Sequence, residues 1–213
     1  MKKVAVMFTG ALVLAGCGGV RYPASYVLNL PPPVPRPSPS TGALGPLAIN
    51  EFRCPEYLCE GRLVYRPTPE EVGFYEYHRW ATNPRQAITQ YVEDGLRARS
   101  LFQSVAFHEG GSEAAYVLTG SIEQLEEVDK GRDVSAVCTI SAQLLNTGTR
   151  TVVWSSTASE TVAVEKRDMR GVVSSLSTAA RSAADHLLLS LTEELPASVA
   201  RTGAMAGRRT ESR

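Results

Sequence analysis

The side chains that most often carry out chemistry are sparse in this chain and poorly spaced for it. No two of its three histidines, His78, His108 and His186, lie four residues apart, the spacing that brings two imidazoles to one helix face to share a metal ion. Side chains of adjacent glutamates, as in Glu126–Glu127 and Glu193–Glu194, diverge and make no acid–base dyad. No serine-nucleophile elbow, phosphate-binding loop or dinucleotide fingerprint occurs. The sequence therefore predicts a protein that is not an enzyme and that uses no cofactor or metal.

Two cysteines, Cys54 and Cys59, lie close together after a predicted strand. A disulfide that closes so short a loop contributes about 2 kcal/mol by loop entropy, provided that the chain reaches an oxidising compartment. The spacing differs from the C-x-x-C redox motif, and no nearby histidine completes a zinc site. The pattern favours a disulfide, while two free thiols and a metal or redox site remain open. Cys138 falls on the apolar face of a predicted strand and is expected in the core.

Aromatic and arginine residues crowd a predicted hairpin between residues 62 and 80. Because side chains alternate along a strand, Phe74, His78 and Trp80 are expected on one face, and Tyr75, Tyr77 and Arg79 on the other. Only one face can pack on helices, and the exposed one would have the composition of a protein–protein contact. Either both faces are covered within the domain, or one contacts a partner. The candidate partner-binding residues are Tyr65, Phe74, Tyr75, Tyr77, Arg79 and Trp80.

The N-terminus carries an export signal. Lys2 and Lys3 precede an uncharged run over residues 4–16, which as a helix is about 20 Å long and too short for the roughly 30 Å core of a bilayer. Leu14-Ala15-Gly16-Cys17 resembles the lipobox of bacterial lipoproteins, which implies cleavage after residue 16 and acylation of Cys17. The alternative is an ordinary secretory signal with an unrelated cysteine. Lipoprotein sorting rules imply the periplasmic face of the outer membrane, because Gly18 stands where aspartate would favour retention in the inner membrane.

Composition excludes several classes of protein. The chain has 213 residues, with 22 Lys+Arg against 22 Asp+Glu, and removal of residues 1–16 takes away two lysines to leave a net charge of −2. A nucleic-acid binder normally carries a basic face, which this balance does not favour. With 43% apolar and 21% charged residues the chain is too apolar to be disordered, and its length suits one domain.

The predicted organisation follows from proline content and hydrophobic periodicity. After the signal peptide (1–16) come a lipidated tether (17–24), one α+β domain (25–196) that contains a proline-rich loop or spacer (31–46), and a disordered tail (197–213). Asn83 and Pro84 give a helix start, and Pro196 is expected to end a long apolar helix that begins after Asp168. Strands are predicted at 26–30, 47–52, 62–66, 74–80, 105–107, 116–128, 134–145 and 150–164, with helices at 84–102 and 169–195.

Strands in runs with separate helices indicate an α+β fold. We expect a single twisted, mostly antiparallel sheet with two helices packed on one face.

Several ordered segments carry a family resemblance. They are the lipobox, Tyr26-Val27-Leu28-Asn29-Leu30-Pro31, Gly45-Pro46-Leu47-Ala48-Ile49, Arg62-Leu63-Val64-Tyr65-Arg66, Phe74-Tyr75-Glu76-Tyr77-His78-Arg79-Trp80, Tyr116-Val117-Leu118-Thr119-Gly120 and Val152-Val153-Trp154-Ser155. Together, over residues 14–195, they resemble the ABC-type transport auxiliary lipoprotein component family, which includes PqiC-like lipoproteins. The resemblance implies an outer-membrane lipoprotein that works with an MCE-type substrate-binding protein and often an ABC permease and ATPase, in a system that moves lipids or other hydrophobic molecules. It implies no catalytic residues, and Cys54 and Cys59 are not part of the pattern.

Two functional hypotheses follow. The first is a docking protein that grips an MCE assembly, expected to be a homo-oligomeric ring because symmetric closure would bury an apolar hairpin. The second is a periplasmic lipid-binding carrier, whose sheet and long helix enclose an acyl chain. Against the carrier, the long helix is rich in alanine and serine, which pack closely and leave little cavity.

Overall fold

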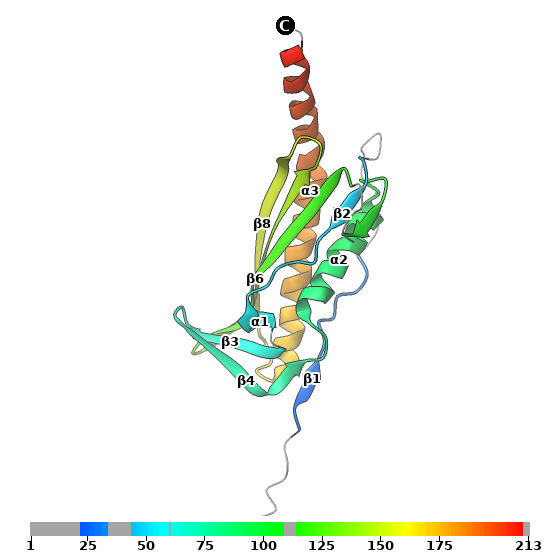
Figure 1. Cartoon of the computed structure of the whole chain (residues 1–213). Coiled ribbons are helices and arrows are strands. Elements are labelled where there is room, and N and C mark those ends of the chain that lie inside the picture. The colour runs from blue at the N-terminus through cyan, green and yellow to red at the C-terminus, as the bar shows by residue number, and fades with distance from the viewer. Residues whose placement is uncertain (1–21, 34–43, 60, 109–113, 211–213) are drawn as a thin grey trace, which may run out of the picture.

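The computed structural model of the chain is an α+β fold built on one open mixed sheet (Figure 1). It describes residues 22–33, 44–59, 61–108 and 114–210. The α+β class and the mostly antiparallel sheet are confirmed. The elements in chain order are β1 (Ala24–Tyr26), β2 (Leu47–Ile49), α1 (Glu56–Cys59), β3 (Arg62–Thr68), β4 (Glu71–Trp80), α2 (Pro84–Arg99), β5 (Val105–Phe107), β6 (Tyr116–Lys130), β7 (Asp133–Asn146), β8 (Thr151–Ala163) and α3 (Met169–Thr210).

The centre of the sheet is a meander of three long antiparallel strands, β6, β7 and β8. Their alternating pattern places wholly buried residues such as Ile122, Ile140 and Leu144 on the face that packs into the core. Gly120 lies on the same face, where the Phe52 ring packs so close that an added Cβ would lie 2.7 Å from it. The meander matches the predicted strands, because alternation and hairpin turns are local signals.

Parallel pairings complete the sheet. The short strand β2 pairs in parallel with β5 and β6, β3 pairs in parallel with β6, and β1 pairs in parallel with β4. The first strand was predicted at 26–30 but ends at Tyr26, because the chain then leaves the sheet and the Asn29 N–H donates to Ser177 Oγ at 3.0 Å. These pairings join segments that are distant in sequence.

Helix α2 forms as its sequence predicts. The Asn83 side chain accepts a hydrogen bond from the Arg85 N–H at 3.0 Å, Pro84 occupies the first turn, and Ser100 ends the helix with a φ of 51°. Its buried face, which includes Ile88 and Leu96, packs against α3 and the sheet. The single-turn helix α1 was not predicted.

Helix α3 crosses the face of the meander and continues beyond it (Figure 1). Its apolar stripe from Val172 to Leu195 is buried, as predicted. The predicted end at Pro196 is wrong, because the helix runs to Thr210 and takes in most of the predicted tail. A proline removes one helical hydrogen bond, but the four alanines between 197 and 206 have high helix propensity and let the helix continue.

Several predicted features lie outside the described residues. These are the signal peptide at 1–16, Cys17 with the tether as far as residue 21, residues 34–43 of the proline-rich segment, and residues 211–213. None of the described helices has both the length and the hydropathy that crossing a membrane requires.

Candidate functional site

The predicted aromatic hairpin is present as strands β3 and β4. The two strands pair antiparallel, with Val64 opposite Phe74 and Tyr65 opposite Gly73. The hairpin turns away from α3 and forms one side of the molecule (Figure 1). Near its tip the Tyr65 ring lies over Gly73, where an added Cβ would come within 2.2 Å of the ring. A side chain at position 73 would therefore displace Tyr65.

Five of the six candidate partner-binding residues keep some exposed surface. Arg79 and Tyr77 are exposed, Tyr77 by 38%, and Tyr65, Phe74 and Tyr75 are half-buried. Trp80 is only 8% exposed and belongs to the hydrophobic core. Within this chain Trp80 therefore supports the base of the hairpin rather than its exposed surface.

The predicted alternation of faces along β4 is wrong. Three residues of β3, from Arg62 to Val64, lie opposite six of β4, from Phe74 to Arg79, so β4 contains an irregularity. As a result, Tyr75 and His78, expected on opposite faces, are in edge-to-face ring contact with centroids 5.8 Å apart. A bulge of this kind shifts the phase of alternation, and composition alone does not reveal it.

Ring contacts join the hairpin to the first strand. Tyr75 packs on Tyr65 at 5.0 Å between centroids, and His78 packs on Tyr26 of β1 at 5.7 Å. The Tyr26 hydroxyl and His78 Nδ1 are 3.2 Å apart, within hydrogen-bond distance. On the hairpin, the Arg62 guanidinium lies 4.3 Å from the centroid of the Phe74 ring, a cation–π contact. The aromatic residues are therefore held by their neighbours.

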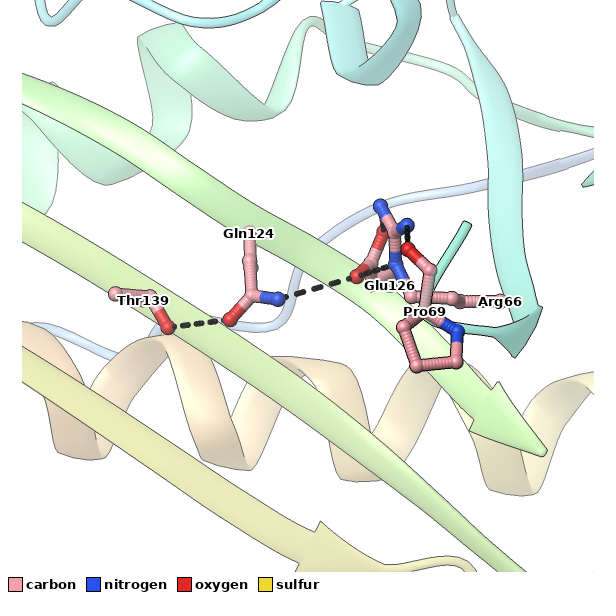
Figure 2. A network of polar contacts seen from close by, with 5 residues as sticks. All are labelled: Arg66, Pro69, Gln124, Glu126 and Thr139. Carbon is pink, nitrogen blue, oxygen red and sulfur yellow. Dashed lines mark hydrogen bonds and ion pairs between the residues drawn. The ribbon is translucent and has the colours of Figure 1, made fainter. Parts of the chain in front are cut away.

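An ion pair fastens β3 to β6 (Figure 2). Arg66 donates two hydrogen bonds to Glu126, from Nε to Oε1 at 2.6 Å and from Nη2 to Oε2 at 3.1 Å. Its Nη1 donates to the Pro69 carbonyl at 3.0 Å. The Glu126 side chain is fully buried, and that of Arg66 is 19% exposed. Bidentate pairing of this kind fixes orientation as well as distance.

The network continues across the sheet from Glu126. Gln124 donates to Glu126 Oε1 at 3.3 Å, Thr139 donates to Gln124 at 2.9 Å, and the hydroxyls of Thr139 and Ser159 are 2.8 Å apart. Figure 2 shows the chain of contacts from Arg66 on β3 through β6 to Thr139 on β7. The hairpin is thus tied to the long strands of the meander.

The neighbouring carboxylate, Glu127, holds the hairpin from the other face of β6. Its Oε2 accepts a hydrogen bond from the Tyr75 hydroxyl at 2.7 Å. Burial raises the pKa of Glu127, and the negative charge of Asp129 adds to this, while the bond from Tyr75 opposes it. Burial and the bond to Glu127 also raise the pKa of Tyr75 well above its usual range. Tyr75 therefore remains a neutral donor.

The two cysteines after β2 form a disulfide, with Cys54 Sγ and Cys59 Sγ 2.06 Å apart. The bond closes the loop that contains α1 and Tyr57. Burial and the negative charge of Glu126 raise the pKa of Tyr57, so this loop lies beside the Arg66–Glu126 pair. Cys138 is a free, buried thiol, and desolvation raises its pKa to about 12.

The histidines stand apart from one another. His78 lies in the ring contacts described above, His108 is exposed, and His186 Nδ1 lies 2.6 Å from Glu160 Oε1. Across the described ranges, no group of three or more His, Cys, Asp or Glu side chains is placed to hold a metal ion.

Sequence reasoning missed the role of the pair Glu126–Glu127. It found that their side chains diverge, which the structure confirms, but not that each holds the hairpin. Two adjacent acidic residues within one predicted strand, one of which had to lie on its buried face, were the available signal. Their partners, Arg66 and Tyr75, are 60 and 52 residues away in sequence.

Comparison with solved structures shows that this fold occurs elsewhere. A protein from Xanthomonas campestris is 21% identical, with 79% of this chain and 94% of that chain covered and a TM-score of 0.64. An uncharacterised protein is 14% identical, with 78% of this chain and 97% of that chain covered and a TM-score of 0.59. A hypothetical protein from Chlamydia trachomatis is 6% identical, with 73% of this chain and 99% of that chain covered and a TM-score of 0.51. At these identities the likeness shows the fold alone.

None of the curated proteins matches the chain. A family model does match, over residues 26–187, which is well over half of the chain, and it describes an auxiliary lipoprotein component of ABC-type transport. The match spans the hairpin, its supports on β6 and most of the packed part of α3. The protein therefore belongs to the ABC-type transport auxiliary lipoprotein component family.

Proposed function

We propose that this protein is anchored by acylated Cys17 to the periplasmic face of the outer membrane, as a non-catalytic auxiliary component of an MCE/ABC-type transport system. The system moves lipids or other hydrophobic molecules across the envelope. The protein works as a homo-oligomer and docks the MCE-family substrate-binding protein of the system. Family membership and the lipobox support the setting, and the hairpin supports the docking role.

The observation that carries the docking role is a partly exposed aromatic hairpin held at both faces. Tyrosine and arginine are the residue types that dominate binding energy at protein interfaces. Glu126 and Glu127 fix the hairpin through Arg66 and Tyr75, so little conformational freedom remains to be lost when a partner binds. The hairpin therefore has the composition and the preorganisation of a docking element.

The interior favours docking over the lipid-carrier hypothesis. The apolar void between the sheet and the two long helices, lined by residues that include Phe52, Trp154 and Leu188, measures about 10 Å³. That is about the volume of a single water-sized probe. Ligand pockets usually measure about 300–1,000 Å³, so this void does not accommodate an acyl chain.

Binding to the purified periplasmic part of the MCE-family protein from the same organism tests the proposal. The full-length lipoprotein in detergent is immobilised, and the dissociation constant is measured for the wild type and for Tyr77→Ala. We expect the variant to bind at least about tenfold more weakly, equivalent to about 1.4 kcal/mol, because Tyr77 is the most exposed aromatic of the hairpin.

Phe107→Ala is the matched control. Phe107 is 40% exposed, close to the 38% of Tyr77, but it lies on β5 and not on the hairpin. The Phe107→Ala variant should bind the MCE-family protein with the same dissociation constant as the wild type. Absence of a complex with the wild type, or equal loss in both variants, contradicts docking through the hairpin.

A further inference from the structure

A second polar site lies away from the hairpin, between the two long helices and the start of the proline-rich segment. This cavity measures about 360 Å³ and is lined by Pro31–Pro33, Tyr91, Arg99, Arg181, Ser182 and Asp185. The prolines form a rigid wall, because their φ angles are fixed. The cavity has the size of a small-molecule site, and none of its lining residues belongs to β3 or β4.

Two guanidinium groups from different helices line the cavity. Arg99 on α2 is 3% exposed and donates from Nη1 to the Gly95 carbonyl at 3.0 Å. Arg181 on α3 makes no hydrogen bond or ion pair with any other residue that the structure describes. Burial and the bond to Asp185 raise the pKa of Tyr91 to about 12, and Arg181 and Arg99 act in the opposite direction. Both cations therefore lie within electrostatic reach of the Tyr91 hydroxyl.

A carboxylate lines the same cavity. Asp185 Oδ1 accepts a hydrogen bond from the Tyr91 hydroxyl at 3.0 Å. Its second oxygen has no hydrogen-bond partner within the described part of the chain, so it can accept a hydrogen bond from a ligand. A simple anion would be attracted by the arginines but repelled by Asp185. A ligand that carries one negative and one positive group would pair with Arg181 and with Asp185 at the same time.

We propose that this cavity binds the phosphoethanolamine headgroup of a phospholipid. The guanidinium group of Arg181 binds the phosphate, for which arginine is well suited, and Ser182 donates a further hydrogen bond. The positive charge of the buried Arg99 adds to the attraction. Asp185 binds the ammonium group. That a phospholipid supplies this headgroup rests on the proposed transport function. That the ligand carries both a negative and a positive group rests only on the charges that line the cavity.

The adjoining groove is suited to the rest of such a molecule. It measures about 410 Å³, shares Arg181 with the cavity, and is lined by Tyr26, Val27 and Val173 together with serine and threonine hydroxyls. The glycerol and the first part of an acyl chain fit this mixed surface. The longer part of each chain stays outside, because the core void of about 10 Å³ holds none of it.

Calorimetric titration of the full-length lipoprotein in a phosphate-free detergent tests the site. The probes are glycerophosphoethanolamine, glycerophosphoglycerol, inorganic phosphate, and dihexanoyl phosphatidylethanolamine below its micellar concentration. The wild type should bind both ethanolamine probes saturably and more tightly than the other two. Arg181→Gln should weaken binding of glycerophosphoethanolamine at least about tenfold, and Asp185→Asn should abolish the preference for ethanolamine over glycerol.

Arg150→Gln is the control, since it makes the same change at an exposed residue in the turn between β7 and β8, which lines neither the cavity nor the groove. It should bind as the wild type does, and equal melting temperatures show that all variants fold. Equal affinity for all four probes, unchanged binding by Arg181→Gln, no saturable binding, or binding of glycerophosphoethanolamine without the short-chain lipid would overturn the proposal. Arg181→Gln should keep wild-type affinity for the docked partner, so the two proposals fail independently.

Discussion

Glu93 lies on the buried face of α2, where its side chain is 1% exposed. One carboxylate oxygen pairs with Arg97, while Oε2 is buried without a hydrogen-bond partner within the described part of the chain. Removing a carboxylate from water disfavours its charged form. Burial therefore raises the pKa of Glu93, and Asp94 adds to the rise, while Arg97 opposes it.

The raised pKa makes stability depend on pH in a defined direction. In the unfolded chain Glu93 has a pKa of about 4.3, and well below that pH it is protonated in both the folded and the unfolded state. As the pH rises from there through the higher pKa of the folded state, the folded state loses stability relative to the unfolded one. Glu93→Gln should remove this loss, so the urea midpoint of the variant should exceed that of the wild type at pH 7 and match it near pH 4. Asp94→Asn, at a side chain 44% exposed, should show no such difference. Equal urea midpoints for the wild type and Glu93→Gln at pH 7 would contradict this account.

The hairpin depends on side chains for its attachment to the sheet. Strand β3 pairs with β6 over two residue pairs only, Tyr65 with Glu127 and Arg66 with Val128. So short a ladder fixes the angle of a hairpin weakly. Two side-chain contacts add to this ladder, Arg66–Glu126 on one face of β6 and Tyr75–Glu127 on the other.

The two halves of the ion pair should respond unequally to mutation. Arg66→Ala leaves a fully buried charge on Glu126 and should lower the free energy of unfolding by about 3–5 kcal/mol. Glu126→Ala should cost less, because Arg66 is 19% exposed and can turn towards water. The double variant Arg66→Met/Glu126→Leu should recover much of the loss, since it leaves no buried charge. Urea unfolding measures all three, and a greater loss in Glu126→Ala than in Arg66→Ala would contradict this account.

At the scale of the whole molecule, the proposed anchor determines where both proposed sites work. Six residues, 18–23, separate Cys17 from Ala24 at the start of β1, and the seven residue steps between these two span at most about 25 Å when fully extended. An acylated Cys17 would therefore keep the domain close to the bilayer. Acyl chains add about 0.8 kcal/mol per buried CH₂, and two or more hold a protein stably.

Cys17→Ser should release the protein from the membrane fraction into the soluble periplasm, while its melting temperature stays that of the wild-type domain. Fractionation of the envelope measures the first and circular dichroism the second. Gly18→Asp keeps the acylation site but carries the residue that sorting rules associate with the inner membrane, and should move the protein there. A Cys17→Ser protein that remains in the outer-membrane fraction would contradict anchoring through this residue.

The local parts of the fold could be predicted because their causes act over a few residues. Asn83 and Pro84 start α2 by capping, and alternation defines the meander β6–β8. The irregular pairing in β4 was missed, because strand register decides it. The continuation of α3 past Pro196 was missed, because the proline was weighed above the helix propensity of the alanines that follow it. In the candidate site, the hairpin residues were identified, but the burial of Trp80 and the supports from Glu126 and Glu127 were not.

The sequence by itself determined the class of fold, the hairpin and the family resemblance, since short-range patterns of charge, proline and apolar spacing are enough for these. Only the tertiary structure decided which strands pair in parallel, and which arginines meet which carboxylates. Arg66 and Glu126 are 60 residues apart, and Tyr91 and Asp185 are 94 apart. Contacts over such separations leave no mark in local spacing, because they form only when packing of the whole core brings the elements together.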